Sequence, residues 1–186
     1  MRSPLSYLPL AAGMLVLVLS LAVGVLTVTS RSSSQNLSTK AALETASLSL
    51  SPQNGDYTFT PGTFYPVGIL VDSAGKSIDG VDVVINYDPT KVKIVEPTLA
   101  TTSLFEQYPL NSVNNVKGEI KLGGATFSDK PVTGIVATFR FQPLSKGEVN
   151  FTFSFTPGAT TDSNIAEHTT AKDILGKVEN GRFFFR

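Results

Sequence analysis

Histidine and cysteine carry much of the nucleophilic and metal chemistry of proteins, and this chain has almost none of either. It contains no cysteine and a single histidine, His168. Thiol nucleophiles, thiolate metal sites and disulfide bonds are therefore excluded. A Ser-His-Asp system would have to be built around His168, and no G-x-S-x-G or comparable motif accompanies it. We interpret His168 as a solvated loop histidine and expect the protein not to be an enzyme.

Carboxylates are the next candidates for chemistry. The segment that begins at Asp162 resembles the start of an EF-hand loop, but its sixth position is Glu167 instead of glycine and its twelfth is Asp173 instead of glutamate. We reject an EF-hand there, while a looser calcium site on loop carboxylates stays open. Paired carboxylates for glycoside hydrolysis also stay open, because their spacing depends on tertiary structure. Gly123-Gly124 lacks a nucleotide-binding pattern, and we expect no cofactor.

Strands must position these side chains, because apolar residues recur with a period of two throughout the second part of the chain. Gly-, Pro- and Asn-containing turns separate the runs, and no sustained helical stripe interrupts them. Many short strands with aromatic inward positions predict an all-β two-sheet sandwich or jelly roll. The alternating runs are 48–50, 67–71, 81–87, 92–94, 120–122, 135–141 and 149–155.

Alternation also predicts which side chains point away from the core. If Val81, Val83 and Ile85 point inward, the residues between them point outward. A small outward face of mixed charge on rigid strands could bind a partner, and an ordinary solvated sheet surface explains the pattern equally well. Phe183–Phe185 is interpreted as a final strand buried on both sides. The predicted outward residues are Asp82, Val84, Asn86, Glu119, Lys121, Thr138 and Arg140.

The charges of the chain cancel. Fifteen basic and fifteen acidic residues give a formal net charge of +0, and neither sign forms a long run. A nucleic-acid-binding protein usually carries a basic patch, so we expect no nucleic-acid partner.

A hydrophobic segment precedes the strands. From Leu8 to Val28 the chain carries no charge, and this length can cross a hydrocarbon layer of about 30 Å as a helix. A cleaved signal peptide usually has a shorter apolar core and a small-residue cleavage site. We therefore expect a retained single-pass membrane anchor rather than a cleaved signal. The expected layout is a cytoplasmic N-terminus (1–7), a transmembrane helix (8–29), a Ser/Thr-rich tether (30–46) and an extracellular domain (47–186).

The order of motifs in the strand region resembles a cohesin domain, the receptor module that binds dockerin modules of enzymes in cellulosomes. The most specific piece is Ile78–Val95, in which a strand ends in Tyr-Asp-Pro and a short apolar strand follows. Three further pieces occur in the matching order: Tyr65–Asp72, Gly134–Phe141 and Asn180-Gly181. The resemblance implies a nine-stranded jelly roll that docks a dockerin on one flat sheet face, without enzymatic activity.

The resemblance also implies particular contacts. Asp82 stands where family members place an acidic partner contact, and Glu167 resembles the acidic contact before the last strand. With these two, the expected partner-binding set is Asp82, Val84, Asn86, Glu119, Lys121, Thr138, Arg140 and Glu167. Gly80 departs from the pattern, because some cohesins have a contacting Asn there. The layout departs too, with one module, no scaffold repeats and an anchor of its own.

Two other functions stay open beside this interpretation. Direct binding of polysaccharide would need exposed aromatic platforms; the chain has no tryptophan, which leaves Tyr57, Tyr65 and Tyr108. A structural surface stalk would need an unpaired edge strand or a head-to-tail interface.

Overall fold

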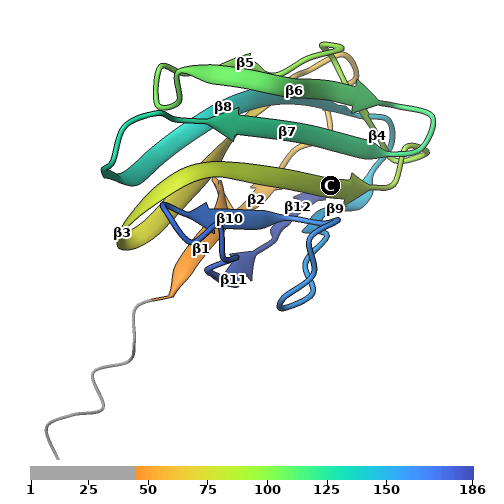
Figure 1. Cartoon of the computed structure of the whole chain (residues 1–186). Helices are drawn as coiled ribbons and strands as arrows, with labels where there is room; N and C mark the ends of the chain where they lie inside the picture. Colours follow the sequence, from red (N-terminus) through yellow and green to blue (C-terminus); the bar gives the residue numbers. More distant parts are fainter. Residues whose placement is uncertain (1–44) are drawn as a thin grey trace, which may run out of the picture. The chain divides into compact units, whose positions relative to one another are not determined.

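The computed structural model describes residues 45–186, and this part of the chain is built of strands (Figure 1). None of residues 45–186 lies in a helix that is long and apolar enough to cross a membrane. The predicted anchor and most of the predicted tether lie outside the described residues. The strands are β1 (Ala46–Ser51), β2 (Asn54–Tyr57), β3 (Tyr65–Tyr87), β4 (Val92–Ile94), β5 (Ala100–Thr101), β6 (Gln107–Asn114), β7 (Glu119–Ala125), β8 (Pro131–Pro143), β9 (Gly147–Phe153), β10 (Asn164–Glu167), β11 (Leu175–Glu179) and β12 (Gly181–Phe185).

Strand β3 takes part in both sheets of a sandwich. Its first part, 65–72, pairs with β1 and β8, and its second part, 78–87, pairs with β7, β9 and β10. The chain changes sheets at Ala74 and Gly75, which have φ angles of 54° and 74°. Asp72 holds this corner, since its Oδ1 accepts a hydrogen bond from the amide of Ala74 at 2.9 Å. Because the chain turns at this corner, one continuous strand belongs to both sheets of the sandwich.

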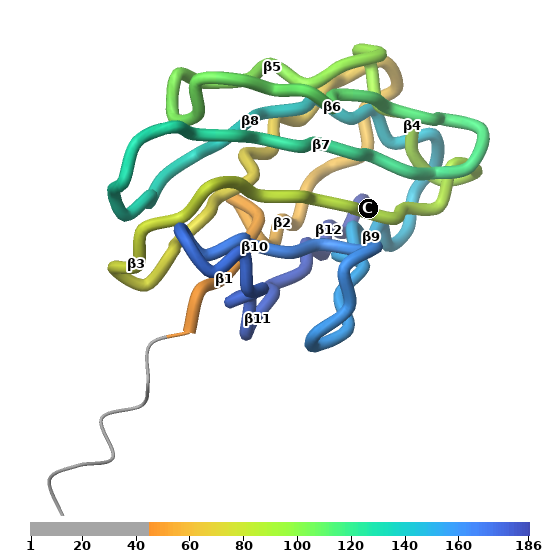
Figure 2. The backbone as a smooth tube through the Cα atoms, in the orientation of Figure 1, coloured from red at the N-terminus to blue at the C-terminus, as the bar shows by residue number. Residues whose placement is uncertain are grey.

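The first sheet has the order β11–β1–β3–β8, and both β4 and β5 pair with the far edge of β8. The second sheet has the order β6–β7–β3, and the other edge of β3 is shared by β10 and β9. Strand β9 continues this sheet through β12 to β2. Figure 2 shows β6, β7, β3 and β10 side by side in the second sheet.

The all-β sandwich prediction is confirmed, but the described chain has twelve strands rather than nine. The difference comes from short pieces such as β2, β4, β5 and β10, which are two to four residues long. Alternation over so few residues is too weak to predict a strand, because pairing with a neighbour decides whether such a segment is extended.

The core lies between the two sheets and is rich in phenylalanine. Phe141 packs against Phe151 and Phe183 with ring centroids 5.1 Å away in each case. Burying a phenylalanine side chain contributes about 1.5–3 kcal/mol to the free energy of unfolding. This packing stabilises a unit that has no disulfide bond.

Two details of the inward pattern were predicted wrongly. Ile135 is 42% exposed, and Val136 is buried in its place, because a register shift against Ile69/Leu70 reverses the alternation in β8. Of the three phenylalanines of β12, Phe183 and Phe185 are buried, while Phe184 points outward and is 41% exposed. The final strand is therefore buried on one side only, as expected for a strand in a two-layer sandwich.

Candidate binding face

The outer surface of the second sheet carries most of the predicted site residues. We call the outward residues of β3 and β7 on this sheet the β3–β7 face. Cross-strand pairing sets Val84 opposite Lys121 and Asn86 opposite Glu119, while Asp82 lies opposite Gly123. Their inward neighbours Val83, Ile85, Ile120 and Leu122 are buried in the core. Because alternation and register fix both strands, the two rows of side chains present one surface.

Some charged side chains of the face form an ion pair with each other, and Asp82 does not. Lys121 Nζ lies 3.2 Å from Glu119 Oε1, so these two side chains form an ion pair within β7. Asp82 is exposed, and its Oδ2 accepts only a long hydrogen bond, 3.4 Å, from Asn164 Nδ2 of β10. Asn86 is exposed as well. The carboxylate of Asp82 and the amide of Asn86 are therefore available to a partner.

A loop between β9 and β10 borders the face and holds its central strand. The hydroxyl of Ser163, which is buried, accepts a hydrogen bond from the amide of Val84 at 3.0 Å. The amide of Ser154 donates to the carbonyl of Val84 at 2.8 Å. The amide and the carbonyl of Val84 are thus both hydrogen-bonded to residues of the chain between β9 and β10, on the edge of β3 that faces away from β7.

Glu167 ends β10 beside the same part of β3. It pairs with Ile78 after a register shift, and its carboxylate lies 3.3 Å from Lys76 Nζ. The hydroxyl of Thr170 donates to Glu167 Oε2 at 2.8 Å. The hydrogen bond from Thr170 and the ion pair with Lys76 hold the pKa of Glu167 below its usual range. Glu167 therefore lies near the end of the face where β3 crosses between the sheets. Asn164, which pairs with Asp82, lies three residues before it in β10.

Thr138 and Arg140 do not belong to this face, which corrects the prediction. Both lie on β8 in the first sheet, where Thr138 pairs with Gly68 and Arg140 with Pro66. Arg140 forms an ion pair with Glu96 and lies 5.8 Å from the centroid of the Phe64 ring. Alternation along one strand predicts inward and outward directions but not which of two sheets the strand joins, so these residues were grouped with the wrong layer.

His168 lies in the turn after β10 and is partnered rather than simply solvated. Its Nδ1 is 2.5 Å from Asp79 Oδ1, and its side chain is 34% exposed. The hydrogen bond to Asp79 raises the pKa of His168. None of the hydrogen bonds in the described part of the chain joins this ring to a serine or threonine hydroxyl.

No group of three or more histidine, aspartate or glutamate side chains within residues 45–186 is arranged to hold a metal ion.

The three tyrosines considered as a platform for sugar rings pack against other rings or bond to the backbone instead. Tyr57 and Tyr65 pack on each other with centroids 4.6 Å apart, and both contact the ring of Phe185. The hydroxyl of Tyr108 donates to backbone carbonyls of Thr102 and Val136.

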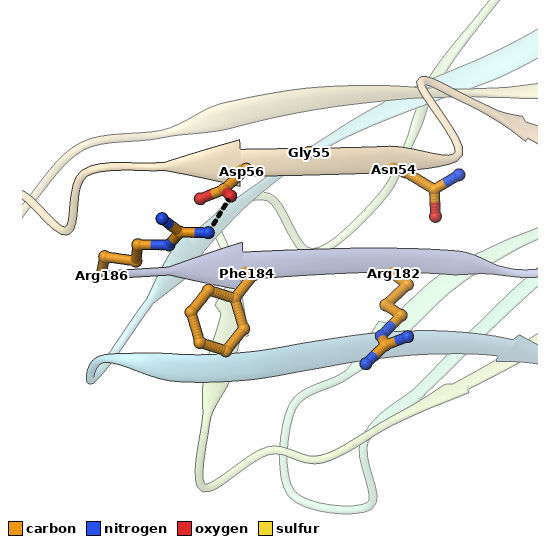
Figure 3. Close-up of a pocket in the computed structure, with 6 residues that line it drawn as sticks. All are labelled: Asn54, Gly55, Asp56, Arg182, Phe184 and Arg186. Carbon is orange, nitrogen blue, oxygen red and sulfur yellow. Dashed lines mark hydrogen bonds and ion pairs between the residues drawn. The ribbon is translucent and has the colours of Figure 1, made fainter.

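A hollow lies over β2 and β12 of the second sheet (Figure 3). Phe184 supplies an exposed aromatic ring there, and the guanidinium of Arg186 lies 5.7 Å from its centroid. Arg186 also forms an ion pair with Asp56 at 2.6 Å, which Figure 3 marks. Asn54 and Arg182 complete the lining. Sequence reasoning missed this hollow because it counted all three terminal phenylalanines as core.

Comparison with known proteins agrees with this architecture. The family model described as "Cohesin domain" matches residues 58–178. The cohesin CaCohA2 from Clostridium acetobutylicum has a TM-score of 0.57 and 21% identity, with coverage of 76% of this chain and 91% of that chain. The sixth cohesin of scaffoldin B from Acetivibrio cellulolyticus, solved with a dockerin, has a TM-score of 0.58 and 17% identity, covering 77% of this chain and 100% of that one.

A third similar structure is a non-cellulosomal cohesin from the archaeon Archaeoglobus fulgidus. Its TM-score is 0.53 at 11% identity, with coverage of 77% of this chain and 92% of the archaeal chain. No curated protein sequence matches the chain. At these identities the solved structures establish a shared fold.

Proposed function

This chain belongs to the cohesin family, and from that premise we propose that its folded unit is a receptor for a dockerin module, which it binds with the β3–β7 face and Glu167. The observation that carries the proposal is a hydrogen-bonded backbone combined with exposed polar side chains on that face. The backbone of Val84 is held by Ser163 and Ser154, while Asp82 and Asn86 stay exposed. A surface of this kind docks a partner with little backbone movement.

Three further statements belong to the proposal. The protein is not an enzyme, and it acts by binding. The apolar run from Leu8 to Val28 anchors it in the cell membrane, and the Ser/Thr-rich segment that follows holds the cohesin domain outside the cell. Its role is to attach dockerin-bearing proteins to the cell surface or to assemble them for polysaccharide-related functions.

The hollow over β2 and β12 favours one alternative, direct binding of a polysaccharide. Sugar-binding sites pair an aromatic ring with a few polar groups, and Phe184 with Asn54 and Asp56 offers this combination. Asp56 already forms an ion pair with Arg186, so fewer polar groups of the hollow are available to a sugar. Polysaccharide binding is therefore the second candidate function.

The test is capture of partners from extracts of the native host by the full chain, solubilised in mild detergent and immobilised. We expect the wild type to retain proteins that contain a dockerin sequence, in the presence of calcium and not after chelation. The double variant Asp82→Ala, Glu167→Ala should bind the captured dockerin about tenfold or more weakly, because two acidic contacts are lost. Biolayer interferometry with the purified dockerin measures the ratio.

The matched control is the double variant Thr138→Ala, Arg140→Ala, which changes outward residues of the opposite sheet. It should bind like the wild type. Equal loss in both variants, or retention of polysaccharide without any dockerin protein, would count against the β3–β7 face. The second outcome would favour the sugar-binding alternative instead.

A further inference from the structure

Asp162 keeps a buried carboxylate oxygen without a partner. The residue is 8% exposed, and its Oδ2 accepts a hydrogen bond from the amide of Thr156 at 2.6 Å. Its Oδ1 is buried and finds no hydrogen-bond donor among the described residues. Buried polar atoms in folded proteins are nearly always hydrogen-bonded, so an unsatisfied one calls for a ligand or another explanation.

Asp162 is one of the residues that line a hollow of about 240 Å³ at the edge of the β3–β7 face. The hollow opens between the β9–β10 loop and the strands β3, β6 and β7. Its wall includes Asp82, Leu110, Lys121, Thr160 and Thr161.

Gly123 leaves space beside two residues of this wall, Asp82 and Leu110. It lies between Leu110 and Asp82 in the paired strands. A Cβ atom at Gly123 would come within 3.1 Å of Asp82 Oδ1 and 3.3 Å of Leu110 Cβ. Any side chain at this position would therefore fill the space beside Asp82.

The hollow has an excess of negative charge. Neither Asp82 nor Asp162 forms an ion pair with another residue of the described part of the chain. The one cation in the lining, Lys121, is paired with Glu119. Two uncompensated carboxylates, one exposed and one buried, attract a cation that can donate several hydrogen bonds.

We propose that this hollow is a socket for a lysine or arginine side chain of the docking partner, whose ammonium or guanidinium group donates to the carboxylates of Asp82 and Asp162. A metal ion fits less well, because no cluster of three or more acidic or histidine ligands occurs among residues 45–186. That the cation comes from a dockerin rests on the proposed function. Binding of an organic cation in the hollow does not.

The experiment therefore has two arms. In the first, the full chain in detergent micelles, labelled with ¹⁵N, is titrated with millimolar lysine amide or norleucine amide, which lacks the ammonium group. We expect saturable amide shifts at Asp162 and Gly123 with lysine amide only. The variant Asp162→Asn should abolish them, and Asp82→Asn should weaken them. Asp56→Asn is the charge-matched control, because it removes one exposed carboxylate from β2, outside the hollow.

In the second arm, Asp162→Asn is measured against a captured dockerin. We expect an affinity loss of about tenfold or more, the usual scale for a lost charge-assisted hydrogen bond. Equal shifts with both amides, shifts that survive in Asp162→Asn, or calcium replacing lysine amide as the only effective ligand would each overturn the socket.

The two proposals fail separately. Unchanged dockerin affinity in Asp162→Asn, with no response to lysine amide, overturns the socket and leaves dockerin binding intact. A lysine amide response without any captured dockerin supports cation binding and counts against the proposed function.

Discussion

Glu167 and His168 are adjacent residues whose pKa values are shifted in opposite directions. The hydrogen bond from Thr170 and the ion pair with Lys76 keep the pKa of Glu167 low, so its carboxylate stays charged at neutral pH. His168 is instead drawn toward protonation by Asp79. The end of β10 therefore presents a carboxylate with a lowered pKa beside an imidazole with a raised pKa.

We predict that His168 titrates above the ordinary histidine pKa of 6.5 and that Asp79→Asn returns its pKa toward that value, because the hydrogen bond favouring the imidazolium is lost. The measurement is the ring-proton chemical shift of His168 against pH. As the only histidine in the chain, it gives an unambiguous signal.

The sign of the effect on stability follows from linkage. A folded-state pKa above the unfolded value means that the pair contributes fully below about pH 6.5, and the contribution is lost as the pH rises through the raised pKa. A titration midpoint at or below 6.5 in the wild type would contradict the role assigned to Asp79.

At the scale of elements, Gly80 explains a departure from the family pattern. A Cβ at Gly80 would lie 2.6 Å from the carbonyl oxygen of Gly124, a backbone atom of the paired strand β7. An asparagine here, as in some cohesins, would therefore require β3 and β7 to shift apart. The glycine is a consequence of close strand approach in this chain, so an asparagine side chain is not available at this position.

The register shift in β8 predicts a difference between two neighbouring residues. Val136 is fully buried and Ile135 is 42% exposed. We expect Val136→Thr to lower the free energy of unfolding by about 1–3 kcal/mol, because it buries a hydroxyl without a partner. Ile135→Thr should change it by about 0.5 kcal/mol or less, as surface substitutions usually do.

Urea denaturation of both variants measures the two changes. Simple alternation through β8, without the shift, would reverse the order, so a larger loss for Ile135→Thr would contradict the observed register. The pair also serves as its own control, because the two substitutions introduce the same side chain.

At the scale of the whole molecule, we predict that the full chain stays in the membrane fraction after an alkaline carbonate wash, and that deletion of residues 1–29 releases it. The reason is the length of the uncharged run, which suffices to span the hydrocarbon layer. Immunoblotting of the fractions measures the partition. Protease added to intact cells should remove the cohesin domain.

A secreted product whose N-terminus begins near Ser30 would instead identify the run as a cleaved signal. The dockerin proposal would survive that result, because the β3–β7 face lies wholly within the described unit. Surface attachment would then need another explanation.

Alternation in the sequence was sufficient to predict the all-β sandwich and the outward direction of Asp82, Val84 and Asn86. Side-chain period is a local property of an extended chain, and the core positions of β3, β7 and β9 follow it closely. The motif around Tyr87-Asp88-Pro89 was sufficient to indicate the family, which the match over residues 58–178 shows.

Tertiary structure alone decided which outward residues share a surface. The placement of Thr138 and Arg140 depends on the pairing partner of β8, and the exposure of Ile135 depends on a register shift between two strands. The socket at Asp162 depends on how a loop closes against three strands. These are relations between segments far apart in the sequence, and the period of any one segment carries no information about its partner.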